Sequence, residues 1–531
     1  MNKPKVALFG SSGTMGYQAF KELWKRKEDY DIVLLVLPSE KDLGLFKRYE
    51  LEAGVPTISG KGVAEGDGFK IVWGDATQYA DVQETIAGVD WVLNAMAYIS
   101  PQADYHPQVA QAVNVDAIKN IIKAIESQPD GAERIRYIHT GTVAKTGNRP
   151  KGIHMGRVGD PLKPSVFDFY AVTKITGERA VLESEIKHWA SLRMTFIMPT
   201  NYQELANLQD PISFHMPIDA YMENLTDRDA GFGLVNCLDI PGDSDFWRRV
   251  YNMGGGPRMR TLAYDYLDKN FQLGGLSGVA SCTERNWFAL RNFHMQYYED
   301  SHVLNEYLHY WRDSMDDYWE TISKDLPLDM KLIAFLARIL PSFRARAERS
   351  TYEIMKDMAE NHKNGPAYWY KDRNDQRISA FFKDYDQYES ISDWGMNMPD
   401  LDAEPEWQRL NHGYDETKTQ LDLSDLQGAA GFRGGECLSR DWNGDMHTPL
   451  KWRCAFKHEF EAKTYTILKA GHWCPDCMPP PWNFDQQAKA NPFLAQVWYA
   501  DNEPGETNFY PEGSILDIAN ADKEWRARNK S

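Results

Sequence analysis

The 531-residue sequence is short of the features that mark special classes of protein. Its six cysteines are too few for a disulfide scaffold, and its 38 Gly and 27 Pro argue against a fibrous or disordered chain. The longest apolar runs, 32–37 and 332–340, fall far short of the ~20 residues that a membrane-spanning helix needs. Residues 1–10 show no signal-type cleavage pattern. We therefore expect a soluble, cytoplasmic protein with no membrane span.

Basic charge is in deficit as well. The chain has 59 Lys and Arg against 77 Asp and Glu, which gives a net charge of −18. A protein that binds nucleic acid or an anionic membrane needs a basic surface to face the phosphates, so the charge argues against a general binder of either, and we expect no nucleic-acid partner. The length suits two to four domains, with a core large enough to fold unaided.

The first part of the chain alternates between strand and helix patterns. Apolar, strand-like runs lie at 6–9, 32–37, 70–73, 91–94 and 135–139, and helical patterns at 17–27 and 109–125 lie between them. Continuous apolar strands that alternate with amphipathic helices are typical of a parallel sheet covered on both faces. We predict an α/β fold with a doubly wound, Rossmann-type parallel sheet.

A glycine pattern follows the first predicted strand and opens the first predicted helix. Gly10, Gly13 and Gly16 form G-x-x-G-x-x-G, which permits a tight turn and lets the backbone approach a pyrophosphate at the helix N-terminus. Such spacing also recurs by chance in loops, but its position between a strand and a helix favours dinucleotide binding. The other candidate contacts in this turn are Ser12, Thr14 and Met15.

The end of the second predicted strand bears on the choice between NAD and NADP. No Asp closes this strand to bind a ribose 2′-hydroxyl, whereas Ser39 and Lys41 could contact the 2′-phosphate of NADP. Glu40 keeps NAD open. We expect NADP(H) as the cofactor, with NAD(H) as the alternative.

A phenol and an ammonium group lie one helical turn apart at Tyr170 and Lys174. A nearby cation lowers the pKa of a phenol, so Tyr170 could donate or accept a proton near neutral pH. Tyr-x-x-x-Lys also occurs by chance on surface helices. The hydroxyl residues Thr140 and Thr142 at the end of the fifth predicted strand make an active site the better interpretation.

Together these motifs resemble the short-chain dehydrogenase/reductase superfamily, and more closely its extended branch, the NAD-dependent epimerase/dehydratase type. The resemblance covers about residues 1–270. It includes Asn114 and Asn120 in the helix before the fifth strand, and the run from Leu192 and Arg193 to Pro199.

The resemblance implies a role for each matched residue. Thr140 would orient the substrate oxygen, with Thr142 as the runner-up, and Tyr170 would be the proton donor or acceptor. Lys174 would anchor the cofactor ribose and lower the pKa of Tyr170, and Asn114 would help to hold the proton relay. Further cofactor contacts are expected at Asp75, Ala76, Lys174 and Pro199. The resemblance also implies a possible homodimer.

Two departures from the family pattern bear on the reaction. The acidic residue often found beside the catalytic hydroxyl of dehydratases is replaced by Gly141, and Ala144 stands where Tyr is common. We therefore expect an NAD(P)-dependent oxidoreductase that transfers hydride between the nicotinamide and a carbonyl or conjugated carbon of a small-molecule substrate. An epimerase, dehydratase or lyase that keeps its NAD bound and acts on a sugar-type substrate is the alternative. A non-catalytic nucleotide-binding scaffold is a further one.

Residues 284–320 hold ten aromatic side chains, and their spacing is mainly helical. Their abundance suits a hydrophobic substrate, although packing is the commoner role of large aromatic side chains. The stretch 330–349 is amphipathic and could lie on a membrane surface, but we expect it to dock against the core. Candidates to line a substrate pocket are Tyr202, His215, Trp287, His294 and Tyr298.

Four of the six cysteines lie close together in the C-terminal part of the chain. With one histidine they form C-x16-C-x3-H-x15-C-x2-C, with the donor types that Zn²⁺ prefers. Cys454, Cys474 and Cys477 would supply three ligands, and either Cys437 or His458 the fourth. A closed site of four protein ligands is structural rather than catalytic. The surrounding residues look like small bacterial zinc-ribbon modules, in which the metal substitutes for a large core.

These observations divide the chain into four parts. We predict a dinucleotide-binding catalytic domain at 1–270 and a helical, aromatic-rich extension that contributes to the substrate pocket at 271–400. A linker follows at 401–421, and a zinc-ribbon-like module with a C-terminal tail occupies 422–531.

Overall fold

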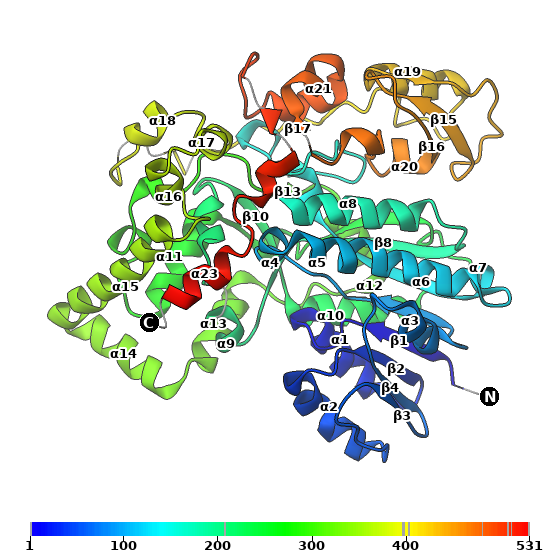
Figure 1. The fold of residues 1–531 in the computed structure, drawn as a ribbon, viewed down its shortest axis with the longest axis horizontal. Coiled ribbons are helices and arrows are strands. Elements are labelled where there is room, and N and C mark those ends of the chain that lie inside the picture. Colours follow the sequence, from blue (N-terminus) through cyan, green and yellow to red (C-terminus); the bar gives the residue numbers. More distant parts are fainter. Residues whose placement is uncertain are drawn as a thin grey trace.

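A large, mostly parallel sheet lies at the centre of the molecule (Figure 1). The computed structural model describes residues 3–206, 209–395, 399–401, 404–480, 482–506, 509–510 and 512–528. The eight strands lie in the order β11 (Arg249–Met253), β8 (His188–Met194), β6 (Arg136–Thr142), β5 (Trp91–Asn94), β1 (Lys5–Phe9), β2 (Asp31–Val36), β4 (Phe69–Trp73) and β3 (Gly62–Glu65). Neighbouring strands are parallel except β3, which pairs antiparallel with β4. The predicted doubly wound α/β sheet is confirmed.

Helices cover both faces of this sheet. Alternate residues of β1 point to opposite faces, so Val6 and Leu8 join one core cluster and Ala7 and Phe9 the other. The first face is covered by α1 (Thr14–Lys25), α2 (Glu40–Glu52), α10 (Asp227–Asn236) and α12 (Ser301–Leu308). The second face is covered by α3 (Tyr79–Ile86), α6 (Ala117–Glu126) and α8 (Phe169–Leu182).

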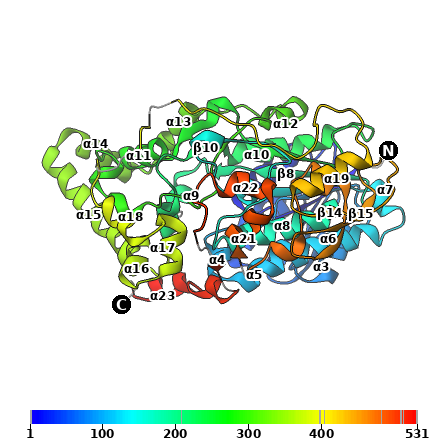
Figure 2. The same ribbon diagram turned by 90° about the horizontal axis from the view of Figure 1, so that it is seen from above.

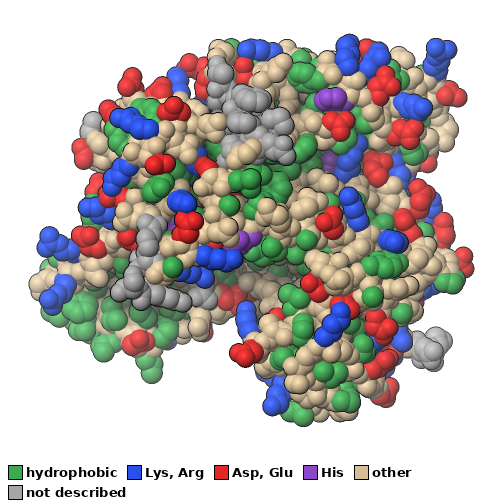
Figure 3. Space-filling view, viewed as in Figure 1, with side chains coloured by type: hydrophobic (Ala, Val, Ile, Leu, Met, Phe, Trp, Pro, Cys, Tyr) green, Lys and Arg blue, Asp and Glu red, His purple; other side chains and the backbone are tan. Residues whose placement is uncertain are grey.

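The strand order places a crevice at the carboxyl ends of the central strands. β1 lies between β2 and β5, so the chain leaves β1 toward one side of the sheet and later returns to the other. In open parallel sheets, ligands bind at this point, where the strand order reverses. On this side the surface of the molecule is hollowed between α2 and the helical extension (Figure 3).

The part of the chain after the sheet is mainly helical, as the sequence predicts. Two small sheets join it to the large one, with strands β9 (Phe196–Met198), β10 (Tyr221–Thr226) and β12 (Arg260–Leu262) in the first, and β7 (Met155–Gly156) and β13 (Tyr297–Tyr298) in the second. The helices of the extension are α11 (Ala263–Leu273), α13 (Met315–Asp325), α14 (Leu328–Ile339), α15 (Pro341–Asn361), α16 (Pro366–Lys371), α17 (Asp375–Phe382) and α18 (Tyr385–Ser390). Helices α14 and α15 lie at the end of the molecule farthest from the sheet (Figures 1 and 2).

Short helices connect these parts. They are α4 (Gln102–Tyr105), α5 (Pro107–Gln111), α7 (Gly131–Arg134) and α9 (Tyr202–Ala206), with a π-helical turn at Ala112–Asp116 between α5 and α6. The π-helical turn carries Asn114, one of the predicted site residues.

The cysteine-rich segment forms a small unit beside α8. Its elements are α19 (Leu423–Phe432), β14 (Glu436–Cys437), β15 (Pro449–Arg453), β16 (Glu459–Lys463) and α20 (Thr464–Leu468). Beyond it lie β17 (Trp482–Asn483), α21 (Phe484–Ala490), α22 (Pro492–Trp498), β18 (Phe509–Tyr510) and α23 (Ala521–Arg528). These last elements pack elsewhere: Phe484 and Trp498 share a core cluster with Trp369 and Phe381 of the helical extension.

Candidate active site and metal-ligand cluster

The glycine turn has the geometry that close approach of a phosphate requires. Gly10 adopts φ +78°, and a Cβ on Gly16 would lie 1.9 Å from the Gly10 carbonyl oxygen, so α1 can pack this tightly only with glycine. The Gly13 N–H donates to the same oxygen at 3.1 Å. Helix α1 begins directly after Gly13, its first turn holds no acidic residue, and Thr14 is exposed. A helix N-terminus of this kind is suited to an anion.

The residues around the predicted adenosine side carry more negative charge than expected. Ser39 caps α2, and its hydroxyl donates to the Asp42 carboxylate at 2.8 Å and accepts from the Asp42 N–H at 3.1 Å. Glu40 and Asp42 both lie in the first turn of α2, next to the exposed Lys41. Two carboxylates at this place would oppose a 2′-phosphate, whereas the Lys41 ammonium between them would attract it.

The remaining cofactor candidates lie near the same edge. Asp75 follows β4, and its carboxylate accepts the Thr77 N–H at 2.8 Å. The Ala76 carbonyl accepts from the Asn120 side chain at 3.2 Å, which fastens this loop to α6. Pro199 directly follows β9.

The predicted catalytic residues meet where β6 ends and α8 begins. The Lys174 ammonium donates to the Thr140 carbonyl oxygen at 2.6 Å, and the Thr140 hydroxyl donates to the Asn94 carbonyl at 2.8 Å. The hydroxyl that contacts the Tyr170 phenol is that of Thr142. The geometry therefore favours Thr142, the runner-up from the sequence, as the hydroxyl beside the phenol, while Thr140 holds β6 to β5.

The pKa of Tyr170 is raised above that of a free phenol, the opposite of the lowering expected from Lys174. Burial is the main cause, the charge of Asp168 adds to it, and the hydrogen bond with Thr142 works against it. Burial also lowers the pKa of Lys174 to about 8, against the opposing charge of Glu178. With its pKa raised, the Tyr170 phenol keeps its proton at neutral pH.

Asn114 holds the backbone around the site. Its side-chain oxygen accepts the Tyr98 N–H at 2.8 Å, and its amide nitrogen donates to the Tyr98 carbonyl at 2.9 Å and to the Thr173 hydroxyl at 3.0 Å. These contacts tie the loop after β5 to α8, one residue before Lys174.

A buried charge cluster that the sequence did not reveal lies one turn further along α8. Glu178 is fully buried, and its carboxylate lies 2.7 Å from Lys145, 2.8 Å from Arg193 and 3.0 Å from His472. Burial alone would raise the pKa of Glu178, but the charges of Arg193 and Lys145 and the His472 hydrogen bond hold it well below its ordinary value. Because His472 lies 294 positions after Glu178 in the chain, no local sequence pattern predicts their contact.

A second group of titratable side chains lies at the N-terminus of α8, beside Tyr170. Asp104 accepts the Phe169 N–H at 2.9 Å and the Ser100 hydroxyl at 2.6 Å, and its pKa is raised by burial and by the charge of Asp168. The Asp168 carboxylate accepts the Ala171 N–H at 2.8 Å and lies 3.2 Å from His294 Nδ1.

Four of the five predicted metal ligands converge. The ligand atoms of Cys454, His458, Cys474 and Cys477 all lie within 4.8 Å of one another. Cys454 Sγ is 3.9 Å from Cys477 Sγ, and His458 Nδ1 is 3.4 Å from Cys477 Sγ. Tetrahedral zinc, with bonds of about 2.3 Å to sulfur and 2.0 Å to nitrogen, would hold two sulfurs ~3.8 Å apart and sulfur and nitrogen ~3.5 Å apart. His458, and not Cys437, therefore joins the three cysteines.

The two ligand pairs come from different elements. Cys454 and His458 lie in the turn between β15 and β16, where the Cys454 N–H donates to the His458 carbonyl at 3.0 Å. Cys474 and Cys477 flank a short helical turn that follows His472 and Trp473. The Trp473 carbonyl accepts from Arg179 of α8 at 2.7 Å, and the Ala470 carbonyl accepts from Arg193 at 2.7 Å. The segment that carries two metal ligands thus also contacts the helix of Tyr170 and Lys174.

Most of the predicted pocket aromatics serve packing. His215, Trp287 and Tyr298 are buried, and the His215 ring lies 4.9 Å from Trp369 and 5.0 Å from Phe381. His294, in contrast, is partly exposed and reaches the active-site helix through Asp168. Tyr202 opens α9 and is half-buried.

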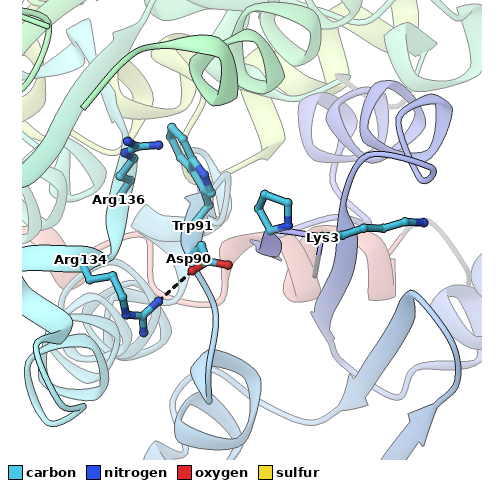
Figure 4. A pocket seen from close by; sticks show the side chains of 6 residues that line it. Lys3, Asp90, Trp91, Arg134 and Arg136 are labelled. Atoms are coloured by element: carbon cyan, nitrogen blue, oxygen red, sulfur yellow. Dashed lines mark hydrogen bonds and ion pairs between the residues drawn. The ribbon is translucent and has the colours of Figure 1, made fainter. Parts of the chain in front are cut away.

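A pocket of about 510 Å³ lies at the opposite edge of the sheet (Figure 4). Asp90, which precedes β5, accepts from Arg134 at 2.9 Å, and the Arg136 guanidinium lies 4.7 Å from the centre of the Trp91 ring. These residues lie at the amino ends of the strands, away from the crevice in which such sheets bind ligands. We do not assign this pocket to the dinucleotide. Its lining residues are Lys3, Pro4, Asp90, Trp91, Arg134 and Arg136.

Among known proteins, no protein-family model and no curated protein matches the chain. Several solved structures are similar in fold. UDP-glucuronic acid 4-epimerase from Bacillus cereus, in complex with UDP-glucuronic acid and NAD, is 16% identical with a TM-score of 0.46, and the match covers 62% of this chain and 99% of that one.

Two dTDP-glucose 4,6-dehydratases show a similar degree of likeness. The one from Bacillus anthracis is 12% identical with a TM-score of 0.45, covering 61% of this chain and 96% of its own. The one from Streptomyces venezuelae is 14% identical with a TM-score of 0.44, covering 60% and 96%. The assignment of the fold rests on the strand order described above, and likeness at this level supports no statement about activity.

Proposed function

We propose that the chain is an enzyme that binds a nicotinamide dinucleotide and uses Tyr170 to move a proton while hydride is transferred at a carbonyl or carbinol carbon. The observation that carries this proposal is the meeting of Tyr170, Thr142 and Lys174 at the carboxyl end of β6. The glycine turn opens at the same edge of the sheet. A protein that only binds a nucleotide would need the glycine turn but not the group of Tyr170, Thr142 and Lys174.

The residues at the carboxyl edge fit a dinucleotide. A Cβ on Gly16 would clash with the Gly10 carbonyl oxygen, and a Cβ on Gly10 would clash with the backbone of Met96, so this turn needs glycine at both positions. The exposed start of α1 presents backbone N–H groups to a pyrophosphate. Asp75 and Ala76 would border the adenine, and Lys174 would bind the nicotinamide ribose. Because Glu40 and Asp42 begin α2, we propose NAD(H) as the preferred form.

The bound cofactor would supply or accept the hydride, and the protein handles the proton. The Tyr170 phenol is protonated at neutral pH, so it can donate to a substrate oxygen as negative charge develops there. Thr142 would hold the same oxygen through its hydroxyl. The Lys174 ammonium, which donates to the Thr140 carbonyl, would stabilise the Tyr170 phenolate that remains.

The second candidate is an epimerase, dehydratase or lyase that recycles a bound NAD. It is favoured by the additional titratable groups beside Tyr170, because eliminating water needs a second proton-transfer group. Asp104 has a raised pKa, and Asp168 is paired with His294. These residues could act as the second proton-transfer group in place of the acidic residue that Gly141 replaces.

One assay separates the two reaction classes. The purified protein is incubated with NAD(H) or NADP(H) and a panel of ketones, enones and nucleotide sugars, and both the 340 nm absorbance and the products are followed. Net hydride transfer predicts a change in absorbance equal to the product formed, with NADH preferred over NADPH. Product without net change in absorbance would assign the recycling class. Failure of both cofactors to bind would overturn the proposal.

We further propose that Cys454, His458, Cys474 and Cys477 hold a structural zinc ion. The four ligands leave no open position for a substrate, and the core of this small unit consists of few buried side chains, among them Leu426, Trp452 and Leu468. Zinc would fix the turn of the β15–β16 hairpin to the segment that contacts α8.

The chain offers a matched pair of variants for this proposal. Cys454→Ser removes a ligand, whereas Cys437→Ser changes a cysteine that lies on β14 and outside the cluster. We expect one zinc per chain, measured by mass spectrometry of the metal, in the native protein and in Cys437→Ser, and a loss of zinc in Cys454→Ser. Equal zinc content in the two variants would refute this ligand set.

A further inference from the structure

Helix α14 presents its large apolar side chains to solvent and its small ones to the protein. Ala334 and Ala337 are buried, whereas Leu328, Leu332, Phe335 and Ile339 are 84%, 58%, 56% and 53% exposed. These four residues recur at intervals of four, three and four, so they form one stripe along the helix. A helix that packs against a protein core normally has the reverse arrangement.

The inward face is fixed by a close contact. A Cβ on Gly275, which has φ +78°, would lie 2.4 Å from the Ala334 carbonyl oxygen, so the helix lies directly against the backbone after α11. Arg338 donates to the Gln272 carbonyl at 3.4 Å. On α15, Glu348 accepts the Ser277 N–H at 2.8 Å, and Tyr352 donates to Glu284 at 2.8 Å. The hairpin is thus held in this orientation, with its apolar stripe outward.

The exposed apolar surface is concentrated here. Among the residues that the structure describes, fourteen large hydrophobic side chains are exposed, and seven of them lie between Leu328 and Ile354. Figure 3 shows hydrophobic side chains gathered at the position that α14 occupies in Figure 1. Single exposed leucines are ordinary on soluble proteins, but a contiguous patch of this kind marks an interaction surface.

The charge around the patch is opposite to that of the whole chain. Residues 324–349, from the end of α13 to the middle of α15, contain six basic and three acidic side chains, in a chain with a net charge of −18. The rest of α15 adds Glu353, Asp357 and Glu360 against Lys356, so the positive charge is confined to α14 and the first half of α15. Lys331, Arg346 and Arg349 are exposed there. A positive surface that flanks an apolar stripe is complementary to anionic lipid headgroups above an acyl layer.

We propose that the α14–α15 hairpin docks the protein on the surface of an anionic lipid bilayer. The stripe of Leu328, Leu332, Phe335 and Ile339 enters the boundary between headgroups and acyl chains, and the basic side chains contact lipid phosphates. None of the described helices is long and apolar enough to cross a membrane, so the hairpin would lie on the surface. A second copy of the chain is a poorer occupant, because the basic residues of 331–349 would be brought close to the same residues of the other copy.

Sedimentation with vesicles tests this proposal without reference to catalysis. The full-length protein is mixed with vesicles of phosphatidylcholine alone, or of phosphatidylcholine with phosphatidylglycerol. We expect binding to the anionic vesicles that weakens as salt is added. Leu332→Ser/Phe335→Ser should weaken it about 100-fold or more, since burying each of the two side chains is worth at least about tenfold. Arg346→Gln/Arg349→Gln should weaken it by about fivefold per charge.

A matched control uses exposed apolar residues on the opposite lobe. Leu51 on α2 and Val63 on β3 are 64% and 41% exposed, and Leu51→Ser/Val63→Ser should bind vesicles like the native protein. Circular dichroism and the melting temperature should be unchanged in all variants, because the altered side chains are exposed. Absence of vesicle binding, or equal loss in the control, would overturn the proposal. A dimer dispersed by Leu332→Ser/Phe335→Ser without vesicle binding would overturn it in favour of a second copy.

Discussion

Replacing Glu178 by Gln should destabilise the protein strongly and alter the active site at the same time. Glu178 is the negative member of a buried cluster whose cations are Lys145, at 2.7 Å, and Arg193, at 2.8 Å. All three side chains are fully buried. Glutamine keeps the shape and some of the hydrogen bonds, including one with Ser191, but removes the charge that compensates the two cations.

The expected size of the effect follows from this burial. Removing one partner of a buried ion pair costs about 3–5 kcal/mol, because the remaining charge is left without compensation. At about 2–4 °C per kcal/mol for a domain of this size, the melting temperature should fall by roughly 6–20 °C. The cost should be smaller in Glu178→Gln/Lys145→Met, because that double variant removes one of the uncompensated cations as well.

The active-site consequence has a separate readout. The charge of Glu178 raises the pKa of Lys174, which burial lowers to about 8. In Glu178→Gln the pKa of Lys174 should therefore fall further, and the alkaline limb of the pH–rate profile should move to lower pH. A loss of stability below about 1 kcal/mol, or costs that simply add in the double variant, would refute the role assigned to this cluster.

Three further predictions concern other parts of the molecule. Burial lowers the pKa of His215 to about 3, so as the pH falls the unfolded state binds a proton at this histidine before the folded state does. Between pH 7 and pH 5 the protein should therefore lose about 2 kcal/mol of stability, measured by urea denaturation. His215→Gln should not show this loss. Gly16→Ala should abolish dinucleotide binding in a fluorescence titration. The control Gly44→Ala, where a Cβ meets nothing within 4 Å, should bind the dinucleotide normally, and its stability should rise by about 0.5–1 kcal/mol. Thr142→Val should lower turnover by about 10²-fold or more and also cost about 1 kcal/mol of stability, because its hydroxyl accepts the Ala144 N–H. Thr140→Val should mainly lower stability, because its hydroxyl bonds the Asn94 carbonyl. The reverse effects on turnover would return Thr140 to the substrate.

The features that could be predicted from the sequence depend on residues that lie close together in the chain. The glycine turn and the pair Tyr170 and Lys174 depend on short spacings, and the five strands are short apolar runs. Strand β8 was missed because it buries Ser191 and Arg193 among its apolar residues, which breaks the expected pattern. Arg193 is buried only because Glu178 faces it.

Features that depend on distant parts of the chain could not be predicted. His472 reaches Glu178 across 294 positions, and no local pattern marks either residue as a partner. The choice of His458 over Cys437 depended on how the β15–β16 hairpin folds. Residues 330–349 were expected to dock against the core. Helix α14 packs against the protein through Ala334 and Ala337, next to Gly275, whereas its large apolar side chains face solvent, and the sequence did not indicate which face would pack.

Tyr170 is the central residue of the proposed chemistry, and one comparison tests its role. Turnover and dinucleotide affinity are measured for the native protein, for Tyr170→Phe, and for Tyr370→Phe, which removes a phenol that bonds Glu389 in the helical extension. We predict that Tyr170→Phe lowers kcat by about 10²–10⁴-fold while the affinity for NAD(H) stays the same, and that Tyr370→Phe leaves both unchanged. Undiminished turnover in Tyr170→Phe would contradict the proposed chemistry.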